Sequence, residues 1–153
     1  MRLRQRGLTL VELIVAFTIM TLLTAMALPL ARFKVRREKE RELRYSLREM
    51  RTAIDKYKDA GDKGVFQCKL GTECYPENID QLVEGVKMAN DPSGKKLRFL
   101  RRIPRDPFTG STDWGLRSTQ DDPKSNGWGG QNVFDVYTKT MEKAPDGTPY
   151  SEW

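Results

Sequence analysis

One carboxylate stands alone in the most apolar part of this chain. Glu12 is the only charged residue between Leu8 and Ala31, and it lies five positions after Gly7. A carboxylate costs about 2.5–3.5 kcal/mol at the centre of a membrane-spanning helix, so it needs a compensating partner. A free amine at Leu8, exposed by cleavage after Gly7, is one such partner, because each buried charge would relieve the other.

The sequence leaves the pairing of Glu12 open. The amine belongs either to the same chain or to a neighbouring chain. Alternatively, the Glu12 side chain reaches back to the lipid headgroups, as long polar side chains do near helix ends.

The apolar run around Glu12 is long enough for a membrane helix. Residues 8–31 span about 36 Å as a helix, against a hydrocarbon core of about 30 Å. The run is too long for an ordinary secretory signal, and a signal anchor for a soluble domain is the plain alternative. Basic residues flank both ends, so the positive-inside rule does not set the orientation. Pro29 predicts either a kink or the end of the helix at the far interface.

Cys68 and Cys74 are the two cysteines of the chain, and they share one short loop. The chain has no histidine and no second cysteine pair, so a zinc site is not expected. We expect a local disulfide formed in an oxidising compartment. Two free thiols are the alternative.

The sequence does not support an enzyme. It contains no histidine, no Gly-x-Ser-x-Gly elbow and no phosphate-binding Gly-x-x-x-x-Gly-Lys loop. Asp121 and Asp122 fit a polar, glycine-rich loop better than an acid pair. The net charge is +6, three of the basic residues precede Gly7, and both signs are mixed elsewhere. We therefore expect no nucleic-acid partner.

The helix is expected to continue beyond the apolar run as a charged stem over residues 32–60. Apolar residues recur there at spacings of four and three, which places them on one helix face. This stripe consists of Leu43, Leu47, Met50, Ile54 and Tyr57. The stripe needs a partner, and the chain's own sheet is the expected one. Gly61 and Gly64 predict the end of the helix.

Residues 61–153 predict one small domain. Residues 78–86 have the pattern of a short amphipathic helix capped by Asn78. Residues 97–100, 112–118 and 132–140 have the composition of strands. The predicted fold class is α+β, with a long N-terminal helix packed on a small antiparallel sheet.

The segment Arg6-Gly7-Leu8-Thr9-Leu10-Val11-Glu12 resembles the leader of type IV pilins and of the pseudopilins of type II secretion. The resemblance implies cleavage after Gly7 by a prepilin peptidase and N-methylation of Leu8. It also implies that Glu12 pairs with the terminal amine of a neighbouring subunit. Pro29 matches a proline that loosens or bends the helix in pilin filaments.

The same resemblance implies a type IV pilin-like fold in four parts. Residues 1–7 are the leader, 8–31 the membrane and filament-core helix, 32–60 the helical stem, and 61–153 a periplasmic globular domain.

The C-terminal half resembles the major pseudopilin of type II secretion. Residues 103–110, Ile-Pro-Arg-Asp-Pro-Phe-Thr-Gly, look like its Pro-x-Asp-Pro-aromatic-Gly segment, and Trp114 stands where an aromatic is usual. Residues 134–138, followed by Asp146-Gly147, are similar to its late strand and calcium loop.

This resemblance implies calcium as a ligand, held by Asp135, Thr138 and Asp146. Oxygen-rich loops suit this hard cation. The chain departs from the pattern because the interval before Asp146 is longer and contains two lysines. Glu142 or Asp122 would be substitute ligands, and a plain turn at Asp146 is the alternative.

The resemblance implies a structural subunit of the type II secretion pseudopilus. Such a subunit forms a homopolymer and works with minor pseudopilins, an inner-membrane assembly platform and its ATPase. It is anchored in the bacterial inner membrane as N-in and C-out, with its domain in the periplasm, where the filament drives protein export. The alternatives are a type IV pilin for adhesion, motility or DNA uptake, and an anchored periplasmic binding domain that never polymerises.

Overall fold

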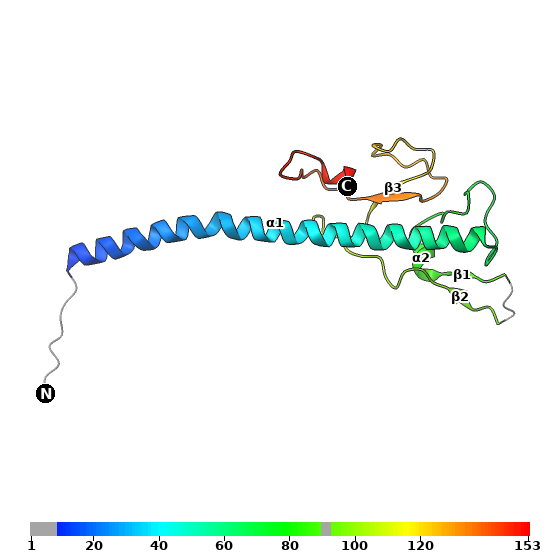
Figure 1. Cartoon of the computed structure of the whole chain (residues 1–153), viewed down its shortest axis with the longest axis horizontal. Coiled ribbons are helices and arrows are strands. Elements are labelled where there is room, and N and C mark those ends of the chain that lie inside the picture. Colours follow the sequence, from blue (N-terminus) through cyan, green and yellow to red (C-terminus); the bar gives the residue numbers. More distant parts are fainter. Residues whose placement is uncertain (1–8, 90–92) are drawn as a thin grey trace, which may run out of the picture. The chain divides into compact units, whose positions relative to one another are not determined.

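A long helix opens the described part of the chain. The computed structural model describes residues 9–89 and 93–153, apart from the side chains of residues 26–31, and α1 runs from Leu10 to Asp62 (Figure 1). Beyond its end, Gly64 has a φ of 69°. The amide of Val65 donates to the carbonyl of Ala60 at 3.0 Å, and that of Gly64 donates to Gly61 at 2.9 Å. These two bonds form a Schellman motif, so the predicted glycine stop is confirmed.

The apolar stripe of the stem forms the centre of the core. Each of its five residues, Leu43, Leu47, Met50, Ile54 and Tyr57, is at most 7% exposed. Side chains from later segments complete the cluster, namely Phe66, Leu82, Leu100, Val133, Val136 and Tyr150. The prediction that this face packs on the rest of the chain is therefore confirmed.

Short elements surround the helix. The helical ones are α2 (Asp80–Glu84) and the 3₁₀ turn η1 (Tyr150–Glu152). The strands are β1 (Val86–Lys87), β2 (Lys96–Leu97), β3 (Gly115–Arg117) and β4 (Asp135–Tyr137). Figure 1 shows β1 and β2 on one side of the C-terminal part of α1 and β3 on the other in that view.

The strands form two antiparallel pairs. Val86 of β1 lies opposite Leu97 of β2. Gly115, Leu116 and Arg117 of β3 lie opposite Tyr137, Val136 and Asp135 of β4. The α+β class is as predicted, with two small sheets in the described residues where one was expected.

The second helix is shorter than predicted. Gly85 has a φ of 78°, which ends the helix after Glu84 and lets Val86 enter β1. Asn78 accepts a hydrogen bond from the amide of Gln81 at 3.0 Å, as expected for a residue that caps this helix. The predicted strands over 112–118 and 132–140 are present in their central residues, as β3 and β4, whereas the one over 97–100 overlaps β2 at Leu97 alone.

Residues Met1–Glu38 and Lys39–Trp153 form two compact units. The first contains the apolar part of α1. The second contains the stem's apolar stripe, both sheets and the C-terminal segment.

Candidate functional site

The apolar part of α1 presents its side chains to the outside. Apolar side chains at ten positions are between 50% and 73% exposed. These are Leu10, Val11, Leu13, Ile14, Val15, Phe17, Ile19, Met20, Leu22 and Leu23. A contiguous apolar surface of this kind marks a site of contact with protein or lipid.

Threonines lie among these apolar residues along the sequence, but their hydroxyl groups add little polarity to the surface. The hydroxyl of Thr18 donates to the carbonyl of Ile14 at 3.0 Å. Thr21 donates to Phe17 at 3.0 Å, and Thr24 donates to Met20 at 2.8 Å. Each hydroxyl is therefore satisfied by the helix's own backbone, which makes these residues compatible with an apolar surrounding.

Glu12 lies in the first turn of α1. Its amide donates to Oγ1 of Thr9 at 3.3 Å, and Thr9 directly precedes the helix. Thr9-x-x-Glu12 has the sequence of a capping box, and this bond is one of the two that define the box. The bond involves the backbone of Glu12, so it positions the first turn of the helix through Thr9.

A group of interacting charged residues lies in the C-terminal unit. Arg51 of α1 donates from Nε to Oδ1 of Asp135 at 2.7 Å and from Nη2 to Oδ2 at 3.3 Å. Nη1 of Arg117, on β3, lies 3.6 Å from Oδ2 of Asp135. We call these three residues the arginine cluster. They join α1, β3 and β4 through one carboxylate.

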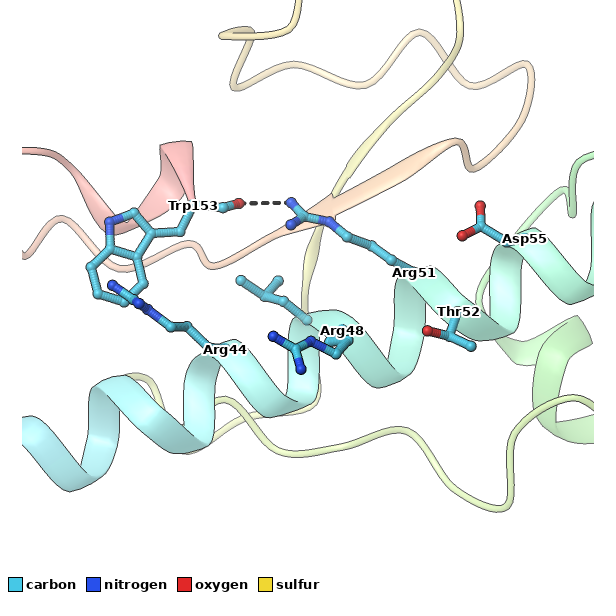
Figure 2. A pocket seen from close by; sticks show the side chains of 7 residues that line it. Arg44, Arg48, Arg51, Thr52, Asp55 and Trp153 are labelled. Carbon is cyan, nitrogen blue, oxygen red and sulfur yellow. Dashed lines mark hydrogen bonds between the residues drawn. The ribbon is translucent and has the colours of Figure 1, made fainter.

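A surface hollow of about 520 Å³ borders this cluster (Figure 2). Figure 2 shows Arg51 directed toward the backbone of Trp153, to whose carbonyl Nη2 donates at 2.7 Å. The guanidinium carbon of Arg44 lies 4.2 Å from the centre of the Trp153 ring. The remaining lining residues are Leu47, Arg48, Thr52 and Asp55.

Comparison with known proteins bears on the apolar part of α1. Residues 2–28 match the family model described as the prokaryotic N-terminal methylation motif. This motif indicates a precursor with a prepilin-type leader, as in type IV pilin-like proteins. No curated protein and no solved structure matches the chain.

Several predicted positions of this pilin-like chain fall in the matched motif. Gly7 and Leu8 lie within it but outside the residues that the structure describes. Pro29 follows the motif and lies within α1, and its side chain is not among those described. Cleavage, methylation and a bend at Pro29 therefore stay predictions.

The motif indicates membrane anchoring through the N-terminal helix. Among residues 9–89 and 93–153, no helix is both long and apolar enough to cross a membrane. The predicted span over residues 8–31 includes Leu8 and the side chains of residues 26–31, which lie outside the description.

The two cysteines of the pilin-like chain are joined. Cys68 and Cys74 form a disulfide with their Cα atoms 5.0 Å apart. The loop that it closes packs near the end of α1, because a Cβ added to Gly61 would lie 2.8 Å from Sγ of Cys68. The disulfide therefore fixes the chain where it leaves the helix.

The three residues implied as calcium ligands each have other partners. Asp135 belongs to the arginine cluster. The hydroxyl of Thr138 donates to Oδ2 of the buried Asp106. Oδ1 of Asp146 accepts a bond from the amide of Thr148 at 2.9 Å, which forms the plain turn that was the alternative.

These contacts do not fit a calcium site, because its central carboxylate already faces two positive charges. Throughout the described part of the chain, no group of three or more His, Cys, Asp or Glu residues could hold a metal ion. Calcium binding is implied by the resemblance alone.

The Asp-Pro segment, residues 103–110, is stabilised by hydrogen bonds of its own residues. Oδ1 of Asp106 accepts the amide of Phe108 at 2.8 Å, and the indole of Trp114 donates to the carbonyl of Pro104 at 2.9 Å. Asp106 is 1% exposed. The turn therefore connects the core aromatic Trp114 with Thr138 beyond β4.

Two aspartates of the C-terminal unit have lowered pKa values. The backbone amides of Ser118 and Gly129 lower the pKa of Asp121, because both donate to its carboxylate. The amide of Thr148 lowers the pKa of Asp146 in the same way. Hydrogen bonds to the charged form stabilise it, so both side chains hold their loops as carboxylates.

Proposed function

We propose that this chain is a structural subunit of a type II secretion pseudopilus. The observation that carries the proposal is the position of the methylation motif, which overlaps the exposed apolar surface of α1. Lipid covers such a surface in a subunit at rest, and the helices of neighbouring subunits cover it in a filament. One surface then serves as both membrane anchor and filament core.

The proposed cycle uses the residues that the leader resemblance assigns. A prepilin peptidase cleaves after Gly7 and methylates Leu8. Glu12 then pairs with the amine of a neighbouring subunit as the helix leaves the bilayer. An assembly platform and its ATPase supply the work, and minor pseudopilins complete the filament. No catalysis by the chain itself is proposed.

The proposed topology places the C-terminal unit in the periplasm. The disulfide between Cys68 and Cys74 supports this placement, because such bonds persist in oxidising compartments. A membrane-impermeant thiol reagent, applied after reduction of intact spheroplasts, tests it. Labelling of Cys68 and Cys74 only after the inner membrane is broken would contradict it.

The first experiment is to measure the intact mass and N-terminal residue of protein purified from native membranes. We expect a chain that starts at N-methylated Leu8. A chain that keeps residues 1–7 in cells with an active prepilin peptidase would overturn the filament proposal and leave a membrane-anchored domain.

Deletion of the gene then separates secretion from the other pilus functions. We expect loss of exported proteins with motility, adhesion and DNA uptake intact. The anchored Asp-Pro segment supports this choice, because it is the part that resembles the major pseudopilin. Loss of motility or DNA uptake with normal secretion would instead favour a type IV pilin.

A further inference from the structure

The arginine cluster joins five separate parts of the C-terminal unit. Besides its two bonds to Asp135, Arg51 donates from Nη2 to the carbonyls of Val136 at 3.3 Å and Trp153 at 2.7 Å. Figure 2 shows the Arg51 side chain extending from α1 toward Trp153. One guanidinium therefore connects the stem helix, β4 and the C-terminal segment.

Arg117 also combines a contact to Asp135 with hydrogen bonds to two backbone carbonyls. Its Nε donates to the carbonyl of Ser125 at 2.9 Å, and its Nη2 donates to the carbonyl of Ser151 at 3.0 Å. Its side chain is 6% exposed, and its guanidinium carbon lies 4.2 Å from the centre of the Tyr137 ring. This residue adds the glycine-rich loop around Ser125 to the same assembly.

The two arginines have the binding pattern of a divalent cation. Together they place two positive charges on one carboxylate and hold four backbone carbonyl oxygens from distant segments. A calcium ion holds loops through the same kinds of oxygen. The guanidinium differs in that its donors are fixed in a plane, so it selects these oxygens by direction.

We infer that the guanidinium groups of Arg51 and Arg117 do the work of a bound cation in this chain, so that its C-terminal segment closes without calcium. Both oxygens of Asp135 already contact a guanidinium, so a metal ion at this carboxylate would face two positive charges. Thr138 and Asp146 are held by Asp106 and Thr148. Lys139, next to Thr138, pairs with Asp113 at 2.7 Å. This role of the two arginines would be the same in a secretion pseudopilus and in a type IV pilus.

The test is the thermal unfolding of the full-length protein in detergent, followed by near-ultraviolet circular dichroism. We expect the same melting temperature in excess calcium and in EGTA. Arg51→Met keeps the apolar stem of the side chain and removes the guanidinium. Because the Arg51 side chain is 38% exposed, we expect a smaller loss than for a buried ion pair, about 5 °C in melting temperature. Calcium should not restore it.

Arg48→Met is the matched control. Arg48 lies on the same helix and lines the same hollow, but it takes no part in the cluster. We expect it to lower the melting temperature by less than about 2 °C, as for an ordinary surface position. An equal loss in both variants would overturn the inference, because general loss of positive charge would then explain it.

Two further measurements keep the inference testable if Arg51→Met does not fold. Arg51→Lys keeps the charge but cannot bridge both carboxylate oxygens. We expect this variant to fold and to have a melting temperature below those of wild type and Arg48→Met. Terbium added to the wild-type protein reports calcium-type sites through emission sensitised by tryptophan. We expect none that calcium displaces. Displaceable emission, or a wild-type melting temperature that falls in EGTA, would overturn the inference.

Discussion

The hydroxyl of Tyr150 donates a hydrogen bond to Oε1 of Glu40 at 2.7 Å, across 110 positions of sequence. The Tyr150 side chain is fully buried, and its ring centre lies 4.3 Å from that of Phe108 and 4.7 Å from that of Trp153. The last turn of the described chain is therefore held to the beginning of the folded stem by a polar bond within an aromatic cluster.

Tyr150→Phe should remove this bond and keep the ring packing. A hydrogen bond to a charged group contributes about 1.5–3 kcal/mol, so we expect a melting temperature lower by roughly 6–12 °C. Thermal unfolding by circular dichroism measures it. Tyr45→Phe is the control, because the Tyr45 side chain on the same helix is 69% exposed. Equal effects of the two changes would show that the buried bond adds nothing.

Gly115→Ala should destabilise the β3–β4 pair. A Cβ at this position would lie 2.2 Å from Cζ of Tyr137, the residue opposite in the pairing. Tyr137 is 5% exposed, and its hydroxyl donates to the carbonyl of Asn126 at 2.8 Å, so the ring cannot move without losing this bond. Overpacking of this kind costs about 1–3 kcal/mol.

Denaturant unfolding of the Gly115→Ala protein measures this loss. Gly127→Ala serves as the control, since its Cβ would meet only Oγ of Ser125 at 3.6 Å, an ordinary contact. A Gly115→Ala protein as stable as Gly127→Ala would show that β3 and β4 separate readily enough to admit the methyl group.

Asp121→Asn should weaken the loop after β3 in a pH-dependent way. The pKa of Asp121 is lowered by the amides of Ser118 and Gly129, at 2.7 and 3.0 Å. A lowered folded-state pKa stabilises the protein above the unfolded value of about 3.9, and this contribution is lost as the pH falls through the folded-state pKa.

Melting temperatures measured as a function of pH provide the test. Wild type should unfold at a higher temperature than Asp121→Asn at neutral pH, and the two curves should meet in acid. Asp122→Asn is the control, because it removes the same charge from the same loop at a carboxylate that accepts one amide, that of Lys124, where Asp121 accepts two. We expect it to lower the melting temperature less than Asp121→Asn does. A wild-type advantage over Asp121→Asn that persists below the folded-state pKa would contradict the assignment.

Glu12→Ala should be processed and inserted but should assemble poorly, because the amine of the neighbouring subunit loses its carboxylate partner. We expect the cross-linked ladder of subunits to fall by about tenfold, corresponding to about 1.4 kcal/mol per contact. Immunoblots of cross-linked cells measure this. Normal ladders would refute the pairing role.

Thr9→Val separates pairing from helix capping. This change removes the Oγ1 that accepts the Glu12 amide but leaves the carboxylate in place. We expect it to retain most of the ladder. If Thr9→Val assembled as poorly as Glu12→Ala, the defect would lie in the start of the helix and not in a bond between subunits.

The residues of the stem could be placed from sequence because one physical rule governs them. A helix that buries one face repeats every 3.6 residues, and the positions from Leu43 to Tyr57 follow that period. The strands were harder to place. Gly115–Arg117 and Asp135–Tyr137 lie within predicted segments, but pairing ends after three residues. Sequence composition continues to favour strands beyond that point.

The arginine cluster could not be predicted from the sequence. Arg51 lies in a stem rich in both charge signs, so nothing in the sequence distinguishes it from the other arginines there. Its carboxylate partner lies 84 positions away, and no local pattern identifies a contact at that range.

The strand β1 was not predicted, for a similar reason. Val86 fits the apolar face of a helix, and only its pairing with Leu97 shows it to be a strand residue.

The acceptors of the arginine cluster have a consequence for how such proteins diverge. Four of its oxygens belong to the main chain, at Ser125, Val136, Ser151 and Trp153. Every amino acid supplies that carbonyl, so the cluster itself requires no particular side chain at these four positions, whereas it does require Arg51, Arg117 and Asp135. Replacing a bound metal by guanidinium groups would thus require few substitutions. The residues that supply only a backbone carbonyl would not have to change. Searches for acidic ligand signatures would pass over such a chain, and a search for the two arginines would find it.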